Sequence, residues 1–105
     1  MAQSLPNEKI EFDWSNISPA GLIGSPDSLR SVRYEFCIPL TQAALAEVQA
    51  IDPNLQCYQT SPGRIGCSCE QYLCIGDTHH PRWRDILYAI AELDYVQRIV
   101  ESFGE

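Results

Sequence analysis

The sequence predicts a single α+β domain in which an antiparallel sheet carries two helices on one face. The chain has 105 residues, 45% hydrophobic and 20% charged, which suits one globular core. Apolar side chains alternate at every second position in some stretches and recur at helical spacing in others. From residue 32 these stretches follow one another as strand, helix, hairpin, helix and strand. This is the βαββαβ order of a ferredoxin-like sandwich, and an extra N-terminal strand precedes it.

The segment before this main body, residues 32–105, is predicted to be a short strand followed by an irregular connection. We assign the short strand to residues 10–14. Residues 15–31 are rich in serine, proline and glycine, which break regular structure. Because the connection also contains apolar residues such as Ile17, we expect it to lie across the main body and to bury them.

The first strand and helix of the main body are separated by a change of period. Apolar side chains occupy every second position of residues 32–38, which predicts a strand with one face in the core. Pro39 ends this strand, and Thr41 is a favourable residue for capping a helix start. Apolar side chains then recur at helical spacing up to an Asp-Pro pair, which predicts a helix over residues 41–52.

A hairpin and a second helix follow. Residues 55–60 and 64–75 are predicted strands, joined by a Ser-Pro-Gly turn. Gly76 interrupts the second of them, and an amphipathic pattern then predicts a helix over residues 81–93. Residues 95–103 are rich in β-branched side chains and are predicted to form the fourth strand, although they also fit a continuation of the helix stripe.

Charge and hydropathy restrict the partners and the location. The 14 acidic and 7 basic residues give a net charge of −7, which disfavours direct binding to a nucleic acid backbone. No apolar stretch approaches the roughly 20 residues of a membrane helix, so we expect no membrane association. Residues 1–10 lack the pattern of a signal peptide, and we therefore expect a cytoplasmic protein.

Five cysteines are the most prominent chemical groups. Thiols in the cytosol stay reduced, so we expect free cysteines rather than disulfides. Strand alternation places Cys57, Cys67 and Cys69 in the core. It places Cys37 and Cys74 on the opposite face of the sheet, which carries no helix.

A metal or redox site is an alternative interpretation of this region. Cys67, Cys69 and Cys74 precede His79 and His80, and thiolates with imidazoles are ligands for zinc. However, a Cys-x-Cys pair in an extended strand separates its sulfur atoms, unlike the closely spaced cysteines of a zinc knuckle. We therefore expect no metal and no other cofactor.

The start of the second predicted helix is the candidate ligand site. Free backbone N–H groups at a helix start attract anions. Five side chains there can contribute to holding a phosphate or a carboxylate: Thr78, His79, His80, Arg82 and Arg84. No glycine-rich phosphate loop precedes them, and we assign no catalytic residue. A small enzyme with its cleft at this loop is a further alternative.

The function that the sequence favours is a small binding or interaction module. The open face of the sheet is predicted to carry Cys37, Tyr58, Tyr72 and Cys74, a mixture less polar than a solvated face requires. Two-fold pairing is the commonest way to cover such a face, so we expect a homodimer. Another protein, or coverage by residues 15–31, would also account for it.

Overall fold

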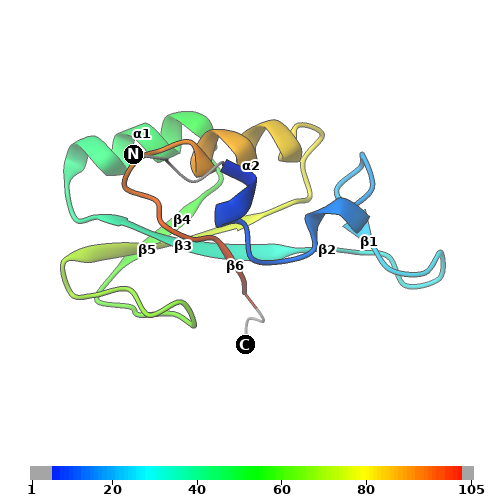
Figure 1. Ribbon diagram of the computed structural model, residues 1–105, viewed down its shortest axis with the longest axis horizontal. Coiled ribbons are helices and arrows are strands. Elements are labelled where there is room, and N and C mark those ends of the chain that lie inside the picture. The colour runs from blue at the N-terminus through cyan, green and yellow to red at the C-terminus, as the bar shows by residue number, and fades with distance from the viewer. Residues whose placement is uncertain (1–5, 103–105) are drawn as a thin grey trace.

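The structure is a computed structural model that describes residues 6–102, and two helices lie on one face of its main sheet (Figure 1). The chain begins with two short 3-10 helices and a small two-stranded sheet, followed by the strands and helices of the main body. The bounds in chain order are η1 (Pro6–Lys9), η2 (Trp14–Asn16), β1 (Leu22–Ile23), β2 (Arg30–Ser31), β3 (Arg33–Pro39), α1 (Gln42–Ile51), β4 (Gln56–Gln59), β5 (Gln71–Asp77), α2 (Trp83–Ala91) and β6 (Val100–Glu101).

The main sheet is antiparallel and has the strand order β4-β5-β3-β6. Its centre is the ladder between β3 and β5, in which seven residue pairs run from Arg33 opposite Asp77 to Pro39 opposite Gln71. Strand β4 lies outside β5, and β6 lies outside β3. The predicted α+β class, with two helices and antiparallel pairing, is confirmed.

The core lies between this sheet and the two helices. Tyr34, Phe36 and Ile38 of β3 are at most 1% exposed, because alternate side chains of the strand point toward the helices. They belong to one cluster with Val48 of α1 and Leu87 of α2. The predicted alternation of residues 32–38 is therefore confirmed.

Both helices begin and end close to the predicted residues. The Thr41 hydroxyl accepts a hydrogen bond from the Ala44 N–H at 3.1 Å, and α1 stops before Asp52 and Pro53, since proline cannot continue a helix. Helix α2 ends at Ala91. Within residues 6–102, no helix has the length and apolar character needed to cross a bilayer.

The C-terminal strand is shorter than predicted. Of residues 95–103, only Val100–Glu101 pair as a strand, with Glu35 and Tyr34 of β3. The alternative in which the helix continues to the end of this segment is wrong, and Phe103 lies outside the described residues.

The predicted strand over residues 10–14 is wrong. Ile10 makes one parallel bridge to Ile99, and the strand goes no further. Instead the chain turns and places the Phe12 ring against the Tyr34 ring, with 6.2 Å between their centroids. Aromatic packing on the core thus replaces the extended pairing that the sequence indicated.

The connection over residues 15–31 packs on the main body, as expected. Ile17 is 3% exposed, and Leu22 and Ile23 are half-buried. The last two residues belong to β1, which pairs with β2 in a small antiparallel hairpin. The hairpin lies at the end of the molecule beyond the main sheet (Figure 1).

Thr78 attaches this connection to the end of β5. Its buried hydroxyl accepts a hydrogen bond from the Val32 N–H at 2.9 Å and donates one to the Gly21 carbonyl at 2.8 Å. Gly21 has a φ of +84°, and a Cβ there would lie 1.8 Å from the Thr78 carbonyl oxygen. Only glycine satisfies both the conformation and the close approach.

The predicted strand over residues 64–75 begins seven residues late, at Gln71. Residues 60–70 form a loop, and Gly63 and Gly66 have φ values of +63° and +87°, which interrupt an extended backbone. The alternation of β5 therefore differs from the prediction. Cys74 lies opposite Phe36 and faces the helices.

The expectation of free thiols is wrong for two cysteines. Cys37 of β3 and Cys67 of the loop form a disulfide with an S–S distance of 2.06 Å. Cys57, Cys69 and Cys74 are free, and their positions are half-buried, exposed and buried, respectively. Cys69 was expected in the core and lies in the solvent-exposed loop instead, because the strand does not extend to it.

The Thr78 hydroxyl gives a direct test of this attachment. We expect Thr78→Val to lower the free energy of unfolding by about 1 to 3 kcal/mol, because the isosteric valine leaves a buried N–H and a buried carbonyl without a partner. Urea denaturation measures the change. Ser15→Ala, which removes an exposed hydroxyl, is the control, with an expected change below about 0.5 kcal/mol. Equal effects of the two substitutions would contradict the structural role of Thr78.

Candidate functional site

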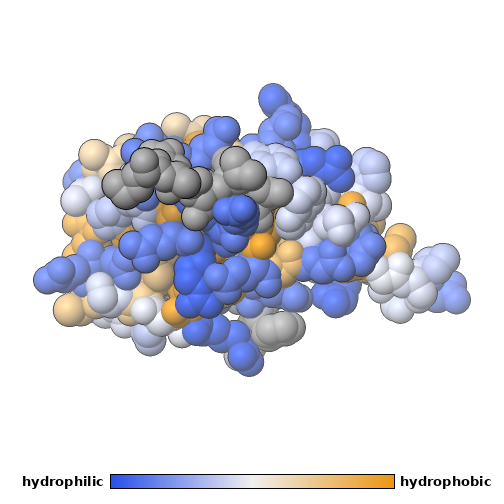
Figure 2. Space-filling view, in the orientation of Figure 1, coloured by the Kyte–Doolittle hydropathy of each residue, from blue (hydrophilic) through white to orange (hydrophobic). Residues whose placement is uncertain are grey.

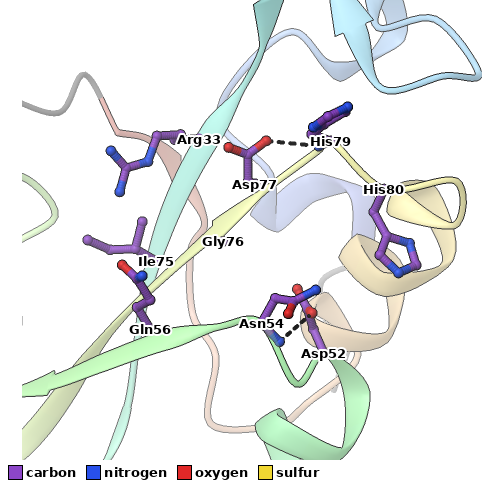
Figure 3. A pocket seen from close by; sticks show the side chains of 9 residues that line it. All are labelled: Arg33, Asp52, Asn54, Gln56, Ile75, Gly76, Asp77, His79 and His80. Atoms are coloured by element: carbon purple, nitrogen blue, oxygen red, sulfur yellow. Dashed lines mark hydrogen bonds between the residues drawn. The ribbon is translucent and has the colours of Figure 1, made fainter.

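A polar cavity of about 330 Å³ lies at the end of the sheet where β5 runs into the loop before α2 (Figure 3). Its lining comes from the start of β3, the connection between α1 and β4, the end of β5 and the following loop. The lining residues are Arg33, Asp52, Asn54, Gln56, Ile75, Gly76, Asp77, His79 and His80.

Two tight turns position the acidic residues of this cavity. The Asp52 carboxylate accepts a hydrogen bond from the Asn54 N–H at 3.0 Å, and the Asp77 carboxylate accepts one from the His79 N–H at 2.8 Å. Both are local bonds two residues along the chain, typical of aspartate at a turn. Asp52 follows α1 and Asp77 ends β5. The two carboxylates therefore come from different elements, and they lie on different sides of the cavity (Figure 3).

His80 connects the cavity to helix α2. Its Nδ1 accepts a hydrogen bond from the Arg82 N–H at 2.9 Å. A neutral imidazole that accepts at Nδ1 carries its proton on Nε2, so the ring has one N–H donor left for another partner. In Figure 3 the ring extends toward Asn54 and Asp52, whereas the His79 side chain points away from them.

The charges in the cavity are mixed. Arg33 and Asp77 are directly opposite on β3 and β5 and both are exposed, yet the described residues show no ion pair between them. Beneath them, burial raises the pKa of the Tyr34 hydroxyl above its usual range, and the negative charges of Asp52 and Asp77 raise it further. The cavity therefore offers hydrogen-bond donors and acceptors together rather than a uniformly positive surface for an anion.

The predicted ligand-binding residues are only partly brought together. His79 and His80 line the cavity. The Thr78 hydroxyl is buried and both of its hydrogen bonds go to the backbone, so its role in the structure is to hold the fold.

The two predicted arginines lie at the start of α2 and are exposed. Arg82 forms an ion pair with Asp85 at 3.5 Å, and both side chains are largely exposed. The Arg84 guanidinium lies over the Trp83 ring, 5.1 Å from its centroid. Neither arginine lines the cavity that His79 lines, so the predicted cluster does not converge on one anion.

The alternative metal set is also divided. Cys67 is bonded to Cys37, Cys69 is exposed in the loop, and Cys74 is buried on the helix side of the sheet. Among residues that the structure describes, no group of three or more cysteine, histidine or acidic side chains could hold a metal ion. The structure gives no support to a shared thiolate and imidazole site.

A second candidate site is the edge of the sheet. On one side, the backbone of Lys9 and Glu11 hydrogen-bonds to Ile99 next to β6 at 2.8 Å, which covers that edge. On the other side, β4 is the outermost strand of the order and pairs with β5 alone. The described part of the chain thus leaves β4 as the uncovered edge.

The helix-free face is partly closed by the loop over residues 60–70. The Cys37–Cys67 disulfide ties the loop to β3, and the buried Glu35 carboxylate accepts a hydrogen bond from the Ile65 N–H at 2.8 Å. A Cβ at Gly63 would lie 2.7 Å from the Glu35 carboxylate, so the loop contacts the sheet closely. Part of the predicted open face is therefore covered by this loop.

The predicted interface residues lie on both sides of the sheet. Tyr58 is 44% exposed on β4, on the helix-free face. Cys37 is on the same face but is bonded beneath the loop. Tyr72 and Cys74 are at most 9% exposed and belong to the core cluster, so the prediction that they lie on the open face is wrong.

Sequence reasoning missed several residues that the fold brings to the cavity. Asp52 was recognised only as part of the Asp-Pro pair that ends a helix, and Asn54 was not singled out. Arg33 was recognised only as an outward-facing strand position. Their common feature is proximity to the end of β5, and the sequence carries no local signal of it.

Comparison of the chain with protein-family models, with curated proteins and with solved structures finds no match. The proposals that follow therefore depend on the geometry of this chain.

The contribution of the loop tie can be measured directly. We expect the double substitution Cys37→Ala and Cys67→Ala to lower the free energy of unfolding by about 3 to 4 kcal/mol, because the crosslink spans 30 residues and restricts the unfolded chain. Urea denaturation gives the change, and amide hydrogen exchange should accelerate in residues 60–70. Cys69→Ala, an exposed thiol in the same loop, is the control. An unchanged exchange rate in this loop would show that the disulfide does not hold it.

Proposed function

We propose that this chain is a small interaction module that forms a homodimer by pairing the free edge of β4 with the same edge of a second copy. The observation that carries the proposal is that β4 is an exposed, uncharged edge strand. The previous expectation of pairing through the whole open face is narrowed to this edge, because the loop over residues 60–70 occupies part of that face.

The chemistry of β4 favours pairing. Its four residues, Gln-Cys-Tyr-Gln, contain no lysine and no proline, which commonly prevent edge strands from joining another sheet. Gln56, Tyr58 and Gln59 are exposed. An outer strand presents unpaired backbone N–H and carbonyl groups at alternate residues, so a second strand there would gain hydrogen bonds without displacing a side chain.

A second copy of this chain is the simplest partner for the β4 edge. Two β4 strands can pair antiparallel around a two-fold axis, which makes each edge complementary to itself. Tyr58 would then lie beside its counterpart and contribute apolar area next to the backbone hydrogen bonds. Because β4 is short, we expect weak to moderate affinity, in the micromolar range.

The face of the molecule drawn toward the viewer in Figure 2 offers little apolar area for association. In the view of Figure 2, hydrophilic residues dominate the side toward the viewer, with small apolar areas between them. Each copy has a net charge of −7, so two copies repel at long range. Because β4 carries no charged side chain, pairing at this edge brings no like charges into direct contact.

Sedimentation of the protein at micromolar concentrations tests the proposal. We expect a dimer whose fraction rises with concentration. Raising the ionic strength from about 0.01 M to about 0.15 M should strengthen it, because the Debye length falls from about 30 Å to about 8 Å and the repulsion is screened. Tyr58→Lys should weaken association by tenfold or more, since it places like charges opposite each other at the two-fold axis.

Gln49→Lys is the matched control, since it adds the same charge at an exposed position of α1. We expect it to leave the dimer fraction within twofold of the unsubstituted protein. A monomer at all concentrations would refute the proposal. A dimer that responds equally to both lysine substitutions would place the interface elsewhere.

The finer description of the fold is also a proposal. We propose that the main body is a ferredoxin-like sandwich with a shortened last strand, and the order β4-β5-β3-β6 with antiparallel neighbours supports this classification. The cytoplasmic location stays a prediction. The Cys37–Cys67 disulfide weighs against it, because stable disulfides are rare in a reducing compartment.

The cavity at the end of β5 favours a second candidate function, the binding of a small polar molecule. The free Nε2 side of His80 and the carboxylates of Asp52 and Asp77 suit a ligand that carries both donors and acceptors. Native mass spectrometry of the purified protein should then show a bound small molecule, and Asp77→Asn should reduce its occupancy at least tenfold. Glu70→Gln, a substitution at an exposed position outside the cavity, is the control. If the Asp77→Asn and Glu70→Gln proteins bind the small molecule to the same extent, this cavity is not its site.

A further inference from the structure

Cys57 and Cys74 form a close cross-strand pair that neither the dimer nor the cavity uses. Cys57 of β4 lies directly opposite Cys74 of β5, and their sulfur atoms are 2.7 Å apart. Both are free cysteines in the structure. Two non-bonded sulfur atoms do not normally approach so closely, and the separation is about 0.65 Å longer than a disulfide bond of about 2.05 Å.

The backbone geometry also suits a covalent bond. Directly opposite residues of an antiparallel pair have Cα atoms about 4.5 to 5.5 Å apart. Disulfides are found with Cα separations of about 4.4 to 6.8 Å, so closing this pair requires no change of register. The ladder between β4 and β5 continues on both sides, at Gln56 and at Tyr58, and it holds the two cysteines in place.

We propose that Cys57 and Cys74 are a redox-active thiol pair that closes to a second disulfide by exchange with a low-molecular-weight disulfide. This inference does not depend on the proposed dimer. It assigns a modification site to the strand pair, and it names the oxidant by its chemical class.

The exchange proceeds in two balanced steps. The Cys57 thiolate attacks one sulfur of the small disulfide RSSR, forms a mixed disulfide and releases one thiolate RS⁻. Cys74 then loses its proton and its sulfur attacks the Cys57 sulfur, which breaks the mixed bond and releases the second RS⁻. The thiolates take up the two protons lost by the cysteines. Overall, two protein thiols are oxidised, and one RSSR is reduced to two RSH.

Cys57 is the residue that reacts first. It is half-buried on the edge strand, whereas Cys74 has no exposed surface. The hydrogen bond with Cys74 lowers the pKa of the Cys57 thiol, although partial burial opposes the effect. The same hydrogen bond, together with burial, raises the pKa of the Cys74 thiol well above its usual range. Once Cys57 is in a mixed disulfide, that hydrogen bond to a thiolate is gone, and Cys74 can release its proton more readily.

Cys69 is a poor competitor for this pair. It lies in the loop over residues 60–70, which covers the helix-free face of the sheet. Cys57 and Cys74 lie on the other face, because Cys74 is opposite the buried Phe36. The sheet itself therefore separates Cys69 from the pair.

The test titrates the protein with mixtures of reduced and oxidised glutathione, quenches with acid, and labels free thiols with N-ethylmaleimide in denaturant. Chymotryptic cleavage after Tyr58 and Tyr72, combined with cleavage after Glu47 by a glutamate-specific protease, separates the peptides of Cys57 and Cys74 from those of the other cysteines. As the mixture becomes oxidising, we expect the Cys57 and Cys74 thiols to lose their maleimide labelling together without gaining glutathione, whereas the exposed Cys69 forms a mixed disulfide with glutathione. The Cys57 and Cys74 peptides should then appear as a crosslinked pair.

Single substitutions distinguish the order of the steps. We expect Cys74→Ala to accumulate a glutathione adduct on Cys57, because the second thiol is missing. Cys57→Ala should leave Cys74 free of glutathione in the folded protein, because Cys74 is buried. Cys69→Ser is the control and should not change the crosslinked peptide.

The proposal is overturned if Cys57 and Cys74 both remain labelled by maleimide in the most oxidising mixture while the Cys37–Cys67 bond is intact. It is also overturned if Cys57 is found linked to Cys67 or Cys69. The crosslink analysis of the unsubstituted protein decides these outcomes even if one of the alanine variants fails to fold.

Discussion

The register between β3 and β5 is the constraint on which the rest of the structure depends. Each residue of β3 has one partner on β5, so the register decides which side chains meet the helices and which meet the loop. Phe36 and Cys74 face the helices together, while Cys37 and Leu73 face the loop. A slip of one residue between β3 and β5 would turn the core side of β5, Cys74 included, toward the loop. The alignment of β3 with β5 therefore decides on which face Cys74 lies, and the ladder between β4 and β5 places Cys57 beside it.

The two faces of this ladder are closed by different interactions. The helix side is closed by apolar packing, which is non-directional and tolerates small adjustments. The other side is closed by the loop over residues 60–70, whose contacts include a disulfide and a hydrogen bond to a buried carboxylate, both of which require specific positions. Because Glu35 is only 3% exposed, the Ile65 N–H offsets part of the cost of removing its carboxylate from water. The loop and Glu35 thus require each other.

The sequence predicted elements whose signals are local. Both helices have a cap or a proline at their ends and an apolar stripe between, and they lie within two residues of the predicted bounds. The strand predicted over residues 64–75 failed because Gly63 and Gly66 favour a turn more strongly than alternation favours a strand. Of the cavity, His79 and His80 were found because they precede a helix. Arg33 and Asp52 could not be found, because they reach the cavity only through strand pairing between distant segments.

The distribution of the cysteines gives the sheet two sides with different thiol chemistry. On the loop side, Cys67 is bonded to Cys37, and the bond is covered by chain that it also holds in place. On the helix side, Cys57 and Cys74 are close but unbonded, and one of them is reachable from the free edge. The fifth cysteine, Cys69, is free and lies in the exposed loop on the opposite side of the sheet from this pair. The sheet lies between the Cys37–Cys67 disulfide and the Cys57–Cys74 thiols, so the two pairs cannot exchange directly. One pair can therefore be oxidised while the other is reduced in the same molecule. The edge strand that carries Cys57 is also the strand left open for pairing in the described part of the chain, so the proposed reactive thiol and the proposed interaction surface are parts of one short segment.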